Sequence, residues 1–113
     1  MGSNPFTILG ALRADIRRPF FGTSIALQIS DFQGGASKVN IGTFGNTPVN
    51  YWYSAVIGSA GYPYIDRAGT TQFRLRFVTD DNNDNGADYM KFFSGNYATA
   101  SARPTLVITY TLP

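Results

Sequence analysis

The chain has 113 residues, of which 43% are hydrophobic and 15% aromatic; it carries a formal net charge of +2 and contains no Cys, His or Glu. This length suits a single domain, residues 1–113, and the apolar content is too high for a disordered chain. The absence of Cys excludes disulfides and thiolate metal sites. A catalytic zinc site would have to be built from Asp alone, and we do not expect one. Basic residues stand singly apart from Arg17 and Arg18, so we expect no nucleic-acid-binding stripe, and no apolar run is long enough for membrane insertion.

The first predicted element covers residues 6–16. Residues 1–3 before it could be a cloning remnant or the place where a longer protein was cut. Leu12, Ala14 and Ile16 alternate with charged residues, and this period of two predicts a strand with one buried face. Gly10 predicts a bulge or a close backbone approach within it. In the loop that follows, Phe20 and Phe21 are expected to fill the edge of the core.

The middle of the chain gives one ambiguous and two clearer elements. Residues 24–33 fit either a strand or a short helix capped by Ser24. Residues 39–44 are a short strand candidate with Val39 and Ile41 on one face. Residues 51–57 predict a strand, and because aromatic residues fall on both of its faces, we expect it to be covered on both sides.

Three more strands are predicted in the last third. Residues 73–78 show the clearest alternation of apolar and charged side chains, and residues 89–93 are expected to pair with them as an antiparallel hairpin, because the connection is too short for a crossover. Residues 105–111 form the last strand. Six or seven short strands separated by turn residues indicate an all-β fold, an antiparallel β-sandwich.

The turn between two of these strands is rich in oxygen ligands. Asp80, Asn82, Asp84 and Asp88 recur at even spacing, and Gly86 lets the backbone bend. Closely spaced carboxylate and amide oxygens are what Ca²⁺ needs, although the spacing departs from an EF-hand loop and no Glu ends it. The alternative is a solvated hairpin turn, because Asn, Asp and Gly tolerate left-handed backbone.

No catalytic constellation is visible. Four of the seven acidic residues lie in that one polar turn, which does not suit a pair of carboxylates flanking a bound sugar. A serine nucleophile has no His to act as its base. We therefore expect a protein that is not an enzyme.

A ligand-binding strip is a further hypothesis. Guanidinium groups can bind carboxylates and sugar hydroxyls, and flat aromatic rings can stack on sugars. The alternative is that the charged residues form a solvated outer face and that the aromatic residues belong to the core. The candidates are Arg74, Arg76, Lys91, Trp52, Tyr53, Tyr62 and Tyr64.

The C-terminal block resembles a known family. The strand FRLRF (Phe73–Phe77), the aromatic segment KFFS (Lys91–Ser94) and the pattern R-P-x-L-x-I-x-Y (Arg103–Tyr110) occur in that order. Together with the segments SDFQGGAS and WYSA, they resemble the disaggregatase-related, DNRLRE-type β-jelly-roll modules of bacterial and archaeal surface proteins. The resemblance covers nearly the whole chain, from Asn4 to Pro113.

The resemblance implies a jelly-roll fold, an extracellular location and no catalysis. Some of these modules bind polysaccharides, including acidic ones, and others are spacers; no binding residue carries over. Such modules usually have further strands before the position of Phe6, and their absence would leave a sheet edge open to a second copy, as a dimer or a filament. Alternatively, the chain closes on its own. We therefore expect an extracellular structural or assembly module whose partner is itself or a neighbouring domain, and alternatively a carbohydrate-binding module.

Overall fold

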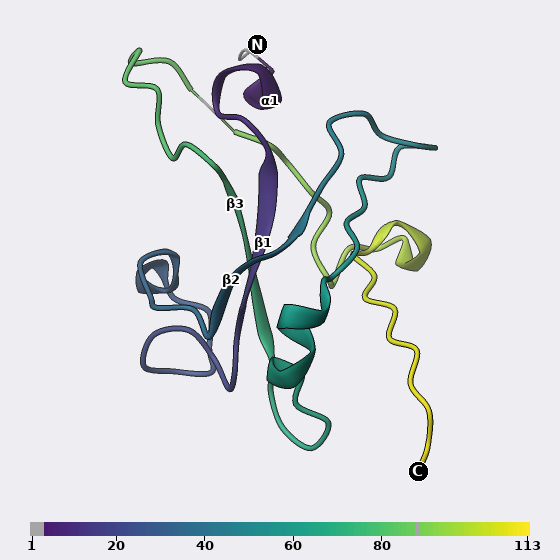
Figure 1. Ribbon diagram of the computed structural model, residues 1–113. Helices are drawn as coiled ribbons and strands as arrows, with labels where there is room; N and C mark the ends of the chain where they lie inside the picture. The colour runs from purple at the N-terminus through teal and green to yellow at the C-terminus, as the bar shows by residue number, and fades with distance from the viewer. Residues whose placement is uncertain (1–3, 88) are drawn as a thin grey trace.

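The computed structural model describes residues 4–87 and 89–113, and it shows a β-rich chain built on one antiparallel sheet (Figure 1). The elements in chain order are the short helix α1 (Pro5–Ile8), strand β1 (Leu12–Arg17), the 3₁₀ helix η1 (Ile29–Phe32), strand β2 (Lys38–Thr43), the 3₁₀ helix η2 (Ser59–Tyr64), strand β3 (Gln72–Phe77) and the 3₁₀ helix η3 (Ala100–Ala102).

The sheet has the order β2-β1-β3, so β1 lies in the centre and pairs antiparallel with both neighbours. The strands predicted for residues 39–44 and 73–78 are confirmed as β2 and β3. A bulge interrupts the β1–β2 ladder, because Ala14 pairs with Gly42 whereas Ile16 pairs with Lys38. Asn40 lies in this bulge with a left-handed φ of 51°, a conformation that Asn tolerates better than most residues.

The strand predicted for residues 6–16 is correct only in its second half. Pro5 begins the helical turn α1, and the Asn4 side chain accepts a hydrogen bond from the Phe6 amide at 3.0 Å as an N-cap. Gly10 then turns the chain with a φ of +79°, and a β-carbon there would lie 3.4 Å from that of Val78. That distance is an ordinary contact with a side chain, and Gly10 lies before β1 begins, so neither the predicted bulge nor the predicted close backbone approach within the strand is found there. The positive φ is what favours glycine at this position.

The two faces of the sheet differ in chemistry. One face carries the core, in which Ala14, Ile16 and Ile41 are buried and Phe73 packs against them. Segments around η2 cover this face with further apolar side chains, among them Ile57, Tyr64 and Ile65. The opposite face carries Asp15 and the arginines of β3, together with Phe21, which is buried as the sequence predicted.

Residues 51–57 do not form the predicted strand. Val49 and Trp52 exchange two backbone hydrogen bonds of 2.9 Å around Asn50 and Tyr51, which both have positive φ as in a type I′ turn. The following residues run beside β2, where the Gly58 amide donates to the Ile41 carbonyl. Only one face of the run is partly covered, and Trp52 and Val56 are exposed, so the expectation of coverage on both sides is wrong.

Three other expectations also fail. Residues 89–93 do not form a hairpin with β3, and residues 105–111 are extended but pair with no strand of the described chain. Residues 105–111 alternate as a strand does, but in the described chain neither segment has a neighbouring ladder to complete its hydrogen bonds. In residues 24–33, neither predicted form occurs: Ser24 caps only a local turn, and the helix begins at Ile29.

The molecule is more open than a typical domain of its mass. Its accessible surface is 8525 Å² for 12.3 kDa, whereas a folded monomer of this mass exposes about 6,100 Å². Its radius of gyration is 15.1 Å, against about 13.3 Å for a compact chain of this length. In the described residues only one sheet is formed, so the second layer of a sandwich is not seen there.

Candidate functional site

The most tightly organised polar cluster centres on Asp15, in the middle of β1. Asp15 lies between Arg74 and Arg76 of β3 and is 0% exposed. Its Oδ2 accepts hydrogen bonds from Arg74 Nε at 3.1 Å, Arg74 Nη2 at 2.8 Å and Arg76 Nε at 2.7 Å. Its Oδ1 accepts from the Asn40 amide at 2.9 Å, which satisfies the backbone of the bulge. One carboxylate therefore joins all three strands.

Arg74 extends this cluster into the loop after β1. Its Nη1 donates to the carbonyl oxygens of Asp31 and Phe32, both at 3.1 Å, and of Gly34 at 2.6 Å. Its guanidinium carbon lies 4.6 Å from the centre of the Phe21 ring, within the range of a cation–π contact. The cluster therefore holds the η1 loop against the sheet.

The electrostatic balance of the cluster keeps Asp15 ionised. Burial acts to raise the pKa of its carboxyl group, but hydrogen bonds from Arg76, from the Asn40 amide and from Arg74 together hold the pKa below its ordinary value. The pKa of Asp66 is also lowered, first by a hydrogen bond from the Ala68 amide and then by Arg18, whose Nε lies 3.1 Å from Asp66 Oδ2. The hydrogen bonds of Asp15 and Arg74 therefore tie the three strands and the η1 loop together.

These contacts bear on the predicted ligand strip. Arg74 is largely buried, and four described atoms already accept its hydrogen bonds, which favours the structural interpretation. Arg76 is about one-third exposed and retains donors that could reach a ligand. The sequence placed Asp15 on the polar face, but its role was missed because its partners lie 59 and 61 positions away. The only signal was one acid on a strand that could face two alternate arginines.

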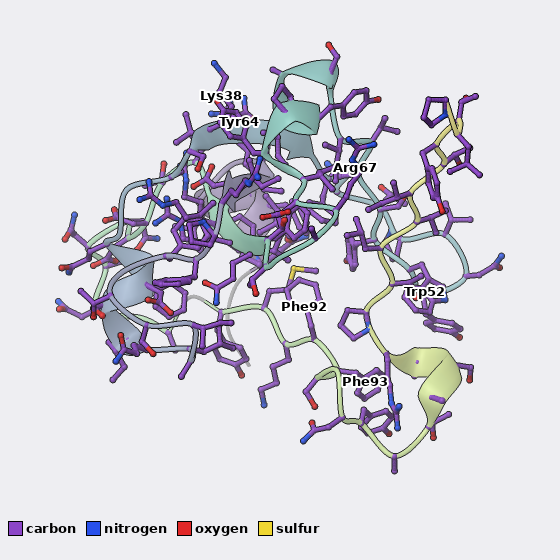
Figure 2. All side chains as sticks on the ribbon, turned by 90° about the horizontal axis from the view of Figure 1, so that it is seen from below. Lys38, Trp52, Tyr64, Arg67, Phe92 and Phe93 are labelled. Atoms are coloured by element: carbon purple, nitrogen blue, oxygen red, sulfur yellow. The ribbon has the colours of Figure 1, made fainter. Side chains whose placement is uncertain are left out.

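The remaining ligand candidates do not form one strip. Trp52 lies on the exposed I′ turn, Tyr62 is exposed on η2, and Tyr64 packs against the core. Figure 2 shows Trp52 out on a loop, whereas Tyr64 is the last residue of η2. The structure does bring Tyr53 and Lys91 together.

Tyr53 and Lys91 line an open hollow of about 380 Å³ with Phe6, Tyr89 and neighbouring residues. The rings of Phe6 and Tyr53 stack with their centres 5.5 Å apart, and Lys91 Nζ lies 5.3 Å from the centre of the Tyr89 ring. Flat rings beside a cation are suited to a sugar that carries an acidic group. The contribution of Phe6 had no signal in the sequence.

The acidic turn is held by local hydrogen bonds. Asn82 Nδ2 donates to Asp84 Oδ2 at 3.0 Å, and the Gly86 amide donates to Asp84 Oδ1 at 2.6 Å. Asn83 and Asn85 have positive φ, as the turn interpretation expects. Within the described residues no group of three acidic side chains is arranged around a metal, and Asp88 lies outside those residues. Calcium binding by Asp80, Asn82, Asp84 and Asp88 stays a prediction.

The C-terminal segment, residues 105–112, belongs to no strand pair of the described chain. It runs away from the sheet as an extended chain (Figure 1), and its large apolar side chains are exposed. These are Leu106, Val107, Ile108, Tyr110 and Leu112. It contains no charge, Gly or Pro, and such segments favour β-pairing with another strand.

The outer edge of β3 is also unpaired in the described chain. The Val78 amide donates to the Ala11 carbonyl of the neighbouring chain segment, and antiparallel strands alternate their hydrogen-bonding direction. Phe73, Leu75 and Phe77 therefore point their backbone amides and carbonyls away from β1. An edge of this kind is a template for an additional strand.

No family model, curated protein or solved structure matches this chain. The resemblance to jelly-roll surface modules therefore stays a prediction. None of the helices in residues 4–87 and 89–113 has the length and apolar character needed to cross a bilayer.

Proposed function

We propose that the protein is a non-catalytic structural module that assembles with a second copy of itself through sheet edges and exposed apolar segments. The observation that carries this proposal is that the described chain has both an uncharged C-terminal segment without a strand partner and a sheet with an open edge. In this proposal the antiparallel sandwich is completed only on association. Placement at the cell surface is supported by the sequence resemblance to jelly-roll modules.

The amount of exposed surface supports an extensive contact. The chain exposes roughly 2,400 Å² more than a compact monomer of its mass. Standard interfaces bury about 800 Å² on each partner, whereas obligate dimers bury considerably more. This excess is total surface, and the exposed apolar side chains of residues 105–112 belong to the exposed surface; large exposed apolar patches mark interaction surfaces. The excess is therefore sufficient for an obligate interface.

The energetics favour contact through more than one segment. Association of two chains costs about 4–15 kcal/mol, because translational and rotational freedom is lost. Burying one Leu, Ile or Val side chain contributes about 1.5–3 kcal/mol, so the C-terminal segment alone roughly balances that cost. If each of two chains contributes its own segment, the apolar gain doubles while the association cost is incurred once. A symmetric exchange is therefore favoured over a one-sided contact.

The molar mass in solution, measured by light scattering over a dilution series, tests the proposal. We expect twice the 12.3 kDa of one chain or more, with dissociation on dilution. A mass of 12.3 kDa at every concentration would overturn assembly as the function.

A second candidate function is carbohydrate binding at the hollow of Tyr53 and Lys91. The observation that favours it is the stacked Phe6–Tyr53 pair beside a cation. The single Trp, Trp52, adjoins Tyr53, so a bound sugar should alter its fluorescence. We expect a saturable change with an acidic oligosaccharide, weakened in Tyr53→Ala and Lys91→Ala but retained in the control Lys38→Ala. No change with neutral or acidic sugars would rule this function out.

A further inference from the structure

We infer that residues 105–112 of one chain add as a strand to the outer edge of β3 in a second copy, and that the second copy returns its own segment in the same way. This inference rests on the proposed self-assembly and names the device that performs it. Both halves of the contact are present in every chain, so two copies suffice to close the exchange.

The segment is two-sided. Along an extended chain, alternate side chains fall on opposite faces, so Leu106, Ile108 and Tyr110 share one face. The other face carries three threonines and one valine, which are Thr105, Val107, Thr109 and Thr111. A strand with this division needs an apolar surface on one side and tolerates a polar one on the other.

The outer edge of β3 has the same division. Phe73, Leu75 and Phe77 lie on the core face, where Leu75 is exposed and the two phenylalanines are only partly covered. Arg74 and Arg76 lie on the opposite face with Asp15. A strand placed at this edge would put its row of Leu106, Ile108 and Tyr110 beside the apolar row, and its threonines beside the arginines.

Hydrogen bonding gives the same pairing. The outward amides and carbonyls of Phe73, Leu75 and Phe77 have no strand beyond them in the described chain. Residues 105–112 contain no proline, so every residue of the segment keeps an amide donor for a ladder. An added strand would satisfy both sets of backbone groups at once, which is the general mode of β-strand addition.

Two matched acidic variants test the inference in the full chain. Ile108→Glu places a charge in the apolar row, whereas Val107→Glu places the same charge one residue earlier, on the face toward the arginines. Light scattering gives the molar mass, and NMR amide exchange gives the protection of each β3 residue. The amides of Arg74 and Arg76, which face β1, report whether the sheet remains folded.

We expect wild type and Val107→Glu to be dimers and Ile108→Glu to be a folded monomer. In the two dimers, the amides of Phe73, Leu75 and Phe77 should exchange at least about tenfold more slowly than the same amides in Ile108→Glu. A dimer whose outward amides exchange freely in wild type, or one that persists in Ile108→Glu, would overturn strand exchange and leave assembly standing. A wild-type monomer with protected outward amides would show that the segment closes on its own chain. A wild-type monomer with unprotected outward amides would overturn both proposals.

Discussion

The three-stranded sheet and the C-terminal part from residue 89 onward have similar sequence character but different structures. In the sheet, contacts join distant positions, as when Asp15 binds Arg74 and Arg76. In the C-terminal part the described hydrogen bonds are short in sequence, as when Arg103 Nε donates to the Tyr97 carbonyl at 2.7 Å, and Phe93 stacks on the nearby Tyr97. The alternating pattern of strands is present in both, but only the sheet has neighbouring strands. An amphipathic pattern therefore needs a partner before it becomes a strand.

The largest loss of stability is expected when Arg74, which binds Asp15 in the centre of the sheet, is replaced. Arg74→Ala leaves Asp15 with fewer compensating donors and releases the loop carbonyls, and breaking one side of a buried ion pair typically costs about 3–5 kcal/mol. Urea unfolding followed by circular dichroism should show this loss in the free energy of unfolding. Arg67→Ala, an exposed arginine, is the matched control. Equal stability of the two variants would contradict the central role of the cluster.

A pair of isoleucine substitutions compares the two regions directly. Ile16→Ala should cost about 2–5 kcal/mol, because Ile16 is completely buried. Ile108→Ala should change the stability of the monomer by less than about 0.5 kcal/mol, because Ile108 is half exposed. Both are measured by chemical unfolding below the concentration at which the chain associates. Similar losses in both variants would mean that the C-terminal segment is packed in solution.

Acidification should weaken the sheet and leave the C-terminal part unaffected. The pKa of Asp15 is lower in the folded chain than the unfolded value of about 3.9, so its contribution to stability is complete above that value. The contribution is lost as the pH falls through the folded pKa, and Asp66 acts in the same direction. Unfolding free energies measured from pH 6 to pH 2 should therefore decline below about pH 4. If Asp15 causes the decline, the unfolding free energy of Asp15→Asn should fall less with acidification than that of wild type. An equal decline in the two proteins would contradict a role for Asp15.

The smallest effect is expected at the periphery of the sheet. Arg18→Ala removes the ion pair with Asp66, and because Arg18 is half exposed we expect a loss of stability much smaller than that of Arg74→Ala. Thermal unfolding at low and at high salt measures it. The difference from wild type should shrink at high salt, because exposed pairs are screened. A loss of stability as large as that of Arg74→Ala would mean that the ion pair at the periphery stabilises the fold as much as the Asp15 cluster does.

The sequence predicted the sheet strands better than the surrounding segments. Alternation located β2 and β3 and the second half of residues 6–16. The usual burial of large apolar side chains correctly predicted Phe21 as buried, whereas Phe20 is only partly buried. In residues 51–57 alternation predicted a strand covered on both sides, and the structure has neither the strand nor that coverage. It could not show that no ladder lies beside the chain there, because periodicity reports which face is apolar and not what covers it.

Predictions about the site were weaker for a similar reason. Candidate residues were chosen by side-chain type, and Arg74 has the right chemistry for a ligand, but its donors are taken up by the fold. Tyr53 and Lys91 line the same hollow, although they are 38 positions apart in the sequence. Phe6 lines it as well, which only the folded structure shows. Contacts at such separations are set by topology, which the local pattern does not contain.

The carboxylate of Asp15 also makes incorrect strand alignments unfavourable. If β3 slipped by one residue along β1, Leu75 would come to face Asp15 in place of an arginine, and a charge would be left in the interior without a cation. A purely apolar face would tolerate the same slip more easily. The chain can therefore select the correct alignment of its sheet while the rest of the module is still unpaired, before any second copy arrives.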